Sequence, residues 1–319
     1  MPTTNRRNFI KQASIAAGGL ALSSSLSSFD WLTQEKETFD FNISLAEWSL
    51  HKALFSGAMT NLDFPEVAKK QYGFEAVEYV NQFFKDKATD KAYLNQLKQR
   101  CDDNGVKSVL IMIDQEGPLA DKDDTLREQA VENHYKWVEA SKYLGGHAIR
   151  VNLHGDSNAD EWHRGAVKSL IKLTAFAEKM DMTILAENHG TFSSDASMMV
   201  KVMKEVNNKR CRTMVDFANF CVRREKGDLW ESPCIQWYDK YKGVEELLPY
   251  AKGVSAKTFD FDANGNESNS DFTRMLKLVK ASGYKGYVGV EYEGDRLSEP
   301  DGIRASKSLL ERIRTELAN

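Results

Sequence analysis

The sequence predicts an α/β protein built as a (β/α)8 barrel, the TIM-barrel architecture, over residues 39–319. Short apolar runs rich in β-branched residues alternate with amphipathic segments, as expected of buried parallel strands and the helices that cover them. Successive runs begin roughly 30 to 40 residues apart, the length of one strand-plus-helix unit. The eight expected strands lie near 41–48, 76–80, 106–113, 147–153, 183–188, 211–217, 253–259 and 287–292.

The helical segments between these runs carry their own end signals. Several are followed by glycine, which commonly ends a helix: Gly73, Gly105, Gly145 and Gly283. A last helix near 302–317 would close the barrel. The alternative, an open doubly wound sheet, normally has a glycine-rich phosphate turn after its first strand. The segment SLAEWSLHKALFSG is not such a turn, so the barrel is favoured.

The first residues differ in kind from the rest. Residues 1–38 contain the pair Arg6-Arg7, then Phe9 and Lys11, and a mildly apolar run rich in Ala, Gly and Ser. This segment resembles a twin-arginine export signal followed by a linker, which implies a periplasmic or secreted protein. A disordered basic tail is the alternative. The run is too short and too polar for a membrane span of about 20 residues.

Composition, net charge and cysteine spacing disfavour some classes of protein. The chain has 319 residues, 41% of them hydrophobic, which is ample for one large core. Its net charge of −4 comes from interspersed charges, so no basic face for nucleic acid is expected and a nuclease is disfavoured. The four cysteines lack the spacing of a zinc site. A Cys221–Cys234 disulfide after export is compatible with the sequence, which does not decide it.

Three carboxylates stand at the ends of predicted strands: Glu187, Asp216 and Glu291. Active sites of such barrels gather at the carboxyl ends of the strands. Because side chains alternate along a strand, Glu187 shares a face with His189, and Glu291 shares one with Glu293. A single carboxylate of this kind is commonly an ion-pair or helix-cap partner. Three at neighbouring strand ends predict a site for a divalent metal.

Other polar residues are expected to line the same mouth. Lys257 would face inward as a general acid, an oxyanion stabiliser or a Schiff-base former, or would only neutralise the carboxylates. Arg150 and His154 share the polar face of the fourth strand, together with Asn152, and suit a hydroxyl-rich substrate. A buried ion pair is the alternative role for Arg150.

Aromatic residues near strand ends provide a further set of candidates. Trp48, with Phe83 or Phe84, is expected to supply an apolar platform for a sugar face, although such residues also serve as ordinary packing. Long loops after the fourth and sixth strands are expected to hold tryptophans that shape a substrate cleft, namely Trp162, Trp230 and Trp237.

The motifs LAENHG, MVDFAN and GVEYEG resemble those of the xylose isomerase-like TIM-barrel superfamily, which contains the sugar phosphate isomerase/epimerase family. The resemblance covers residues 41–317. It implies that Glu187, Asp216, Glu291 and a histidine bind a divalent metal such as Mn²⁺. It also implies that Glu187 and Glu291 exchange a proton on opposite sides of a substrate carbon.

Two positions depart from that pattern. Ser255 stands where the family has a metal-binding histidine, and Asn219 stands where it has a substrate-contacting one. The expected consequences are weaker metal binding, a metal shell completed by water, or recruitment of Asp260, Asp262 or His189 as a ligand. A shell made only of oxygen ligands favours Mn²⁺, Mg²⁺ or Ca²⁺ over Zn²⁺.

The resulting prediction is a metal-dependent isomerase or epimerase that removes a proton beside a carbonyl of a free sugar, keto-sugar or cyclitol. The catalytic residues would be Glu187, Glu291 and Lys257, and the substrate-binding residues Arg150, His154, His189, Asn219, Trp48 and Glu293. The alternatives are a lyase or dehydratase acting on a keto-sugar or glycoside with the same metal site, a Schiff-base aldolase, and a non-catalytic carbohydrate-binding barrel. A small carbohydrate is the expected partner, and a homodimer is compatible with the fold.

Overall fold

A computed structural model describes residues 39–318. Eight parallel strands form a closed barrel in the order β1-β10-β9-β6-β5-β4-β3-β2, which confirms the predicted fold class and excludes the open sheet. The barrel strands are β1 (Asn42–Ala46), β2 (Ala76–Val80), β3 (Lys107–Ile113), β4 (Ala148–Asn152), β5 (Thr183–Glu187), β6 (Cys211–Asp216), β9 (Ala251–Thr258) and β10 (Tyr287–Tyr292). The predicted runs lie within about two residues of these strands at either end.

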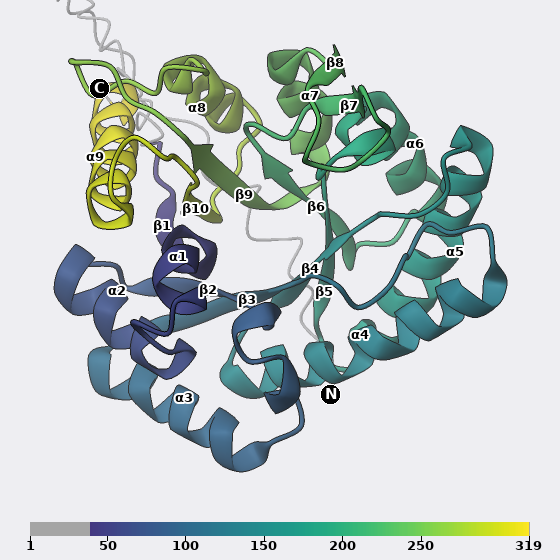
Figure 1. The fold of residues 1–319 in the computed structure, drawn as a ribbon, viewed down its shortest axis with the longest axis horizontal. Coiled ribbons are helices and arrows are strands. Elements are labelled where there is room, and N and C mark those ends of the chain that lie inside the picture. Colours follow the sequence, from purple (N-terminus) through teal and green to yellow (C-terminus); the bar gives the residue numbers. More distant parts are fainter. Residues whose placement is uncertain (1–38, 319) are drawn as a thin grey trace, which may run out of the picture. The chain divides into compact units, whose positions relative to one another are not determined.

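Helices surround the barrel on its outer side, except the short α1 (His51–Phe55), whose Phe55 packs on Trp48 just after β1 (Figure 1). The others are α2 (Phe64–Tyr72), α3 (Lys91–Asn104), α4 (Asp124–Leu144), α5 (Ala159–Glu178), α6 (Ala196–Val206), α7 (Lys240–Leu247), α8 (Phe272–Ala281) and α9 (Glu299–Ala318). Six of them begin at an Asp or Asn whose side chain accepts a hydrogen bond from a backbone N–H of the first turn. The glycines after α2, α3 and α4 adopt the left-handed conformation that ends a helix.

The interior of the barrel has a polar end above a layer of mostly apolar side chains, in which the buried carboxyl of Glu78 accepts a hydrogen bond from Ser44 Oγ. Its apolar part is a cluster of buried side chains from the inward faces of the strands, among them Ala46, Val80, Leu110, Met112, Ala148, Leu185 and Met214. Further along β5 and β6, two residues after Leu185 and Met214, the inward positions are Glu187 and Asp216. The packed cluster therefore closes the barrel beneath the polar residues.

An additional two-stranded sheet interrupts the repeat between β6 and α7. It is an antiparallel hairpin of β7 (Cys221–Arg224) and β8 (Cys234–Trp237), which lies outside the eight predicted strands. A disulfide joins Cys221 to Cys234 across the two strands, so the pairing that the sequence left open is formed. Figure 1 shows this hairpin beside α6 and α7. We call it the β7–β8 hairpin.

The N-terminal export signal proposed for residues 1–38 lies outside the described residues. Across residues 39–318, every helix is either too short or too polar to cross a membrane.

Candidate active site

The three predicted carboxylates converge at the polar end of the barrel. Glu187 ends β5, Asp216 ends β6, and Glu291 lies on β10. One carboxylate oxygen from each lies within 4.8 Å of the others, and all three side chains are buried. Strand alternation explains this meeting, because each residue is the outermost inward-facing position of its strand. We call these three residues the acidic cluster.

Ser255 of β9 lies inside the acidic cluster. Its Oγ is 2.8 Å from Asp216 Oδ2 and 2.8 Å from Glu291 Oε2. A hydroxyl has one hydrogen, so Ser255 donates to only one of these oxygens at a time. The other oxygen of Asp216, Oδ1, accepts hydrogen bonds from the backbone N–H groups of Ala218 and Asn219. Asp216 is thus oriented with Oδ2 toward the cluster.

Arg150 supports the acidic cluster from β4. Its Nε lies 2.8 Å from Glu187 Oε2, and its Nη1 donates to Asp114 Oδ1 at 2.7 Å. Asp114 also accepts from Asn152 Nδ2 at 2.7 Å. The buried ion pair considered for Arg150 is therefore formed. Burial would raise the pKa of Asp114, but the guanidinium of Arg150 holds it well below its usual range.

Lys257 occupies the opposite side of the cluster, on β9. Its Nζ lies 3.3 Å from Glu291 Oε1 and 3.2 Å from Glu293 Oε1. Burial opposes the charge of this ammonium, yet Glu291 and Glu293 raise the pKa of Lys257 well above its ordinary value. A protonated amine held between two carboxylates is a poor nucleophile. This geometry disfavours the Schiff-base role and supports charge neutralisation.

The site holds more carboxyl groups than cationic groups. Two cations, Arg150 and Lys257, face five carboxyl groups: Asp114, Glu187, Asp216, Glu291 and Glu293. Burial, together with the charges of Asp216 and Glu291, raises the pKa of Glu187 well above its usual range. Burial and Glu291 also raise the pKa of Asp216, to about 6, against the opposing effect of Lys257. Such raised values mark a site that a further cation would stabilise.

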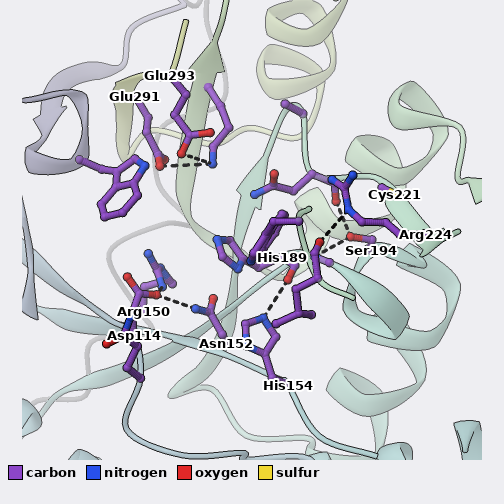
Figure 2. A pocket seen from close by; sticks show the side chains of 18 of the residues that line it. Asp114, Arg150, Asn152, His154, His189, Ser194, Cys221, Arg224, Glu291 and Glu293 are labelled. Carbon is purple, nitrogen blue, oxygen red and sulfur yellow. Dashed lines mark hydrogen bonds and ion pairs between the residues drawn. The ribbon is translucent and has the colours of Figure 1, made fainter. Parts of the chain in front are cut away.

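A cavity of about 910 Å³ opens above the acidic cluster. Every predicted substrate-binding residue lines it: Trp48, Arg150, His154, His189, Asn219 and Glu293. Figure 2 shows Glu291 and Glu293 on one side, Arg224 and Cys221 on another, and His189 between them. The side chain of His154 contacts the carbonyl oxygen of His189 through Nε2 at 3.0 Å. The cavity therefore connects the cluster with the β7–β8 hairpin.

Several buried polar atoms around this cavity have no hydrogen-bond partner within the described chain. They are Asn152 Oδ1, His189 Nδ1 and Asn219 Nδ2. Buried polar atoms are normally paired. Donors and acceptors left free beside a cavity suit a ligand that carries hydroxyl groups.

The three residues considered as replacement metal ligands lie outside the acidic cluster. Asp260 does not join the acidic cluster, because its carboxylate pairs with Arg296 at 2.7 Å. Asp262 lies in an exposed turn, where it accepts hydrogen bonds from the backbone of Asn264 and Asn266. His189 lines the cavity but is not part of the group that could hold a metal.

The aromatic expectations were partly met. Trp48 packs on Phe83, with ring centroids 6.0 Å apart, whereas Phe84 is buried against Trp137 instead. Trp230 and Trp237 line the cavity. Trp162 does not lie in a loop: it belongs to the first turn of α5, is fully buried, and donates from Nε1 to the carbonyl of Leu153.

Asp114 is the functional candidate that sequence reasoning missed. It directly follows β3, so it repeats the pattern of an apolar run ending in a carboxylate that identified Asp216. Its importance depends on Arg150, and only the register between β3 and β4 places those two residues together.

Comparison with known proteins identifies the family of this barrel. The sequence pattern of the xylose isomerase-like TIM barrel matches residues 67–313. The chain belongs to the xylose isomerase-like TIM barrel family. Among solved structures, 3-keto-D-glucoside 4-epimerase from E. coli superposes with a TM-score of 0.63 at 15% identity, covering 86% of this chain and 100% of that one. The IolI protein, whose structure holds a zinc atom, superposes with a TM-score of 0.64 at 15% identity, covering 87% and 99%.

One curated relative of this xylose isomerase-like barrel also matches at the sequence level. The C-glycoside deglycosidase alpha subunit of Arthrobacter globiformis is 34% identical over 86 residues. That match covers 25% of this chain and 22% of the relative. It spans well under two thirds of the relative's length, and the two structural similarities concern the fold.

Proposed function

We propose that this protein is a metal-dependent isomerase or epimerase that transfers a proton at a carbon beside a carbonyl of a free sugar, keto-sugar or cyclitol. The observation that carries the proposal is the acidic cluster, with three buried carboxylates whose oxygens lie within 4.8 Å of one another. Buried like charges at this separation repel strongly unless a cation is present. The neighbouring Arg150 and Lys257 do not balance all the carboxyl groups of the site.

The donor set fits a divalent metal ion. Glu187, Asp216 and Glu291 would hold it through carboxylate oxygens, with the Ser255 hydroxyl beside two of them. Oxygen donors without a histidine favour Mn²⁺ or Mg²⁺. When bound, such an ion would polarise a carbonyl or hydroxyl of the substrate.

The protein groups would provide the proton transfer. Glu187 and Glu291 come from β5 and β10, which lie on different sides of the barrel, and would remove and return the proton. Arg150 fixes the carboxylate of Glu187, and Lys257 fixes that of Glu291. Return to the opposite face of the carbon epimerises the substrate. Return to the neighbouring carbon converts an aldose to a ketose.

The known proteins support a carbohydrate substrate. Two of the similar structures are a 3-keto-D-glucoside 4-epimerase and a D-tagatose 3-epimerase-like protein. The match to a C-glycoside deglycosidase subunit favours the second candidate function, a lyase acting on a glycoside. A carbanion formed at the same site would then expel a group from the adjacent carbon instead of regaining a proton.

We also propose export by the twin-arginine route to the periplasm or the exterior. The Arg6-Arg7 pair supports it, and so does the Cys221–Cys234 disulfide, because disulfides persist mainly in oxidising compartments.

The decisive test is elemental analysis of purified protein, together with Glu187→Ala and Asp216→Ala variants. We expect near-stoichiometric Mn²⁺ or Mg²⁺ in the parent and its loss in both variants. Glu47→Gln is the matched control, since Glu47 is fully buried but lies outside the cluster. Proton exchange of keto-sugars in deuterated water then tests the reaction. A protein without bound metal, not stabilised by added Mn²⁺, would contradict the proposal.

A further inference from the structure

Among residues 39–318, two of the three large aromatic side chains that are most exposed lie on the β7–β8 hairpin, and the third is Phe55 of α1. Trp237 is 61% exposed and Trp230 is 43% exposed, and both line the cavity above the acidic cluster. Tryptophan is costly to leave in water because its ring carries a large apolar area. Two of them on one hairpin, at one cavity, indicate a surface that a ligand covers.

The hairpin is held in a fixed shape. The Cys221–Cys234 disulfide ties its two strands. Arg224 closes the connecting loop, donating from Nε to the carbonyl of Leu229 at 2.8 Å and from Nη1 to that of Ser232 at 2.6 Å. A wall fixed in this way loses little conformational entropy when a ligand binds.

Trp230 is anchored from one side. Its ring lies 4.6 Å from the ring of His189, in an edge-on arrangement, and Arg224 lies 5.8 Å from its centroid. Gly190 lies so close that a Cβ there would be 3.4 Å from the indole. These contacts hold the Trp230 ring in place and leave the rest of its surface exposed to solvent. Trp237 has no ring contact of this kind among residues 39–318, and most of its surface is exposed.

A second aromatic group borders the cavity from the first strands. Trp48 lines the cavity and packs on Phe55 and Phe83, with centroids 5.9 Å and 6.0 Å away. The volume of about 910 Å³ is near the upper end of the range, about 300–1,000 Å³, typical of sites for drug-sized ligands. A single sugar ring at the carboxylates would leave the hairpin side of this cavity unfilled.

We propose that the β7–β8 hairpin forms a second subsite, in which Trp230 and Trp237 bind the aglycone ring of a glycoside whose sugar ring lies at the acidic cluster. The inference rests on the proposed function and extends it, because the substrate becomes a two-ring glycoside in place of a monosaccharide. The required chemistry is a ring with a flat apolar face. An aryl group and a second pyranose both offer one, and both stack on indole.

The test uses the metal-loaded protein and matched sets of methyl, phenyl and glucosyl glycosides of several sugars, with binding measured by calorimetry. We expect the phenyl or the glucosyl member of at least one set to bind about tenfold more tightly than its methyl counterpart. Trp237→Ala and Trp230→Ala should abolish that preference, whereas Trp237→Phe should keep most of it. Ile235→Ala is the control, since Ile235 is 53% exposed on the same strand but does not line the cavity.

The outcomes separate the two proposals. A preference for the phenyl member alone identifies an aryl aglycone, and one for the glucosyl member identifies a second sugar. Equal binding within every set, no binding in any set, or a preference that survives both alanine variants overturns the subsite. Metal content and solvent proton exchange test the acidic cluster separately. Loss of exchange with an intact ring preference would contradict the proposed reaction and not the subsite.

Discussion

Asn188 holds the backbone of Asp216 by both of its hydrogen-bonding groups. The side-chain Nδ2 of Asn188 donates to the carbonyl of Asp216 at 3.0 Å, and the N–H of Asp216 donates to Asn188 Oδ1 at 2.9 Å. Asn188 directly follows Glu187, so this amide links the ends of β5 and β6. Two members of the acidic cluster are thereby fixed relative to each other by a side chain that is itself fully buried.

Replacing Asn188 should therefore affect both stability and the metal site. We expect Asn188→Ala to lower the free energy of unfolding by roughly 1–3 kcal/mol, because it leaves buried backbone groups unpaired. Its affinity for Mn²⁺ should fall as well. Urea unfolding with and without Mn²⁺ measures both effects. Asn133→Ala, at an amide outside the site, is the control, and an unchanged Mn²⁺ affinity would show that Asn188 does not position Asp216.

Replacing Lys257 should increase the stabilisation that the protein gains from a bound metal. Lys257→Met removes the cation beside Glu291 and Glu293 while leaving both carboxylates in place, which we expect to cost roughly 3–5 kcal/mol. A divalent ion would supply the missing positive charge. Added Mn²⁺ should therefore raise the melting temperature of this variant more than that of the parent. An equal rise would argue that Lys257 does not neutralise the cluster, and borohydride trapping on Lys257 would restore the Schiff-base role.

Glu47 provides a pH dependence outside the active site. This fully buried carboxyl accepts from Asn61 Nδ2 at 2.8 Å and from the N–H of Val80 at 2.9 Å. Burial nevertheless raises its pKa from 4.5 to about 8. The folded state thus retains a proton that the unfolded state releases. The protonated Glu47 contributes fully to the free energy of unfolding below pH 4.5. This contribution is lost as the pH rises to 8, and the free energy of unfolding falls by up to about 1.4 kcal/mol per pH unit.

Glu47→Gln should flatten that slope. The neutral amide keeps the shape of the carboxyl, and rotation of the Asn61 amide would let Asn61 accept from it while donating to the hydroxyl of Tyr93, its present partner. Urea unfolding at intervals between pH 5 and 8, the range set by the shift of Glu47, compares the variant with the parent. A slope that is the same in both would assign the pH dependence to other groups.

The disulfide predicts a local effect of reduction. Closing a loop of about 15 residues contributes roughly 3 kcal/mol in the chain-entropy model. Because Cys221 and Cys234 lie in the hairpin and not in the barrel, reduction should open residues 225–233 to proteases before the barrel unfolds. Limited proteolysis with and without dithiothreitol tests this. Cys221→Ser/Cys234→Ser should be cleaved equally in both conditions, and cleavage that begins in the barrel would contradict the expectation.

The sequence was sufficient for the barrel and for the acidic cluster because both follow from local rules. Glu187 and Asp216 end apolar runs, and the period of two places them on the inward face. The sequence does not show which side chains of neighbouring strands contact each other. Asp114 has the same local signal, yet its link to Arg150 depends on register.

The hairpin was missed for a related reason. Its strands have four residues each, and β8 is largely exposed, so neither gives a run of buried apolar residues. The polar segment around Trp162 favours a loop when it is read from the sequence alone. In the structure Asn158 caps the N-terminus of α5, and Trp162 lies in the first turn of this helix with its indole buried in the core.

Among residues 39–318, side-chain packing beneath the acidic cluster leaves the cavity open toward Trp48 and the β7–β8 hairpin. Whatever enters past Trp48 and the hairpin must leave by the same route, since the other end of the barrel is filled with side chains. An isomerase or epimerase releases a single product, so the order of product release does not arise. An enzyme that cleaves a glycoside releases two products, and the fragment nearer the cavity opening must leave before the fragment at the carboxylates.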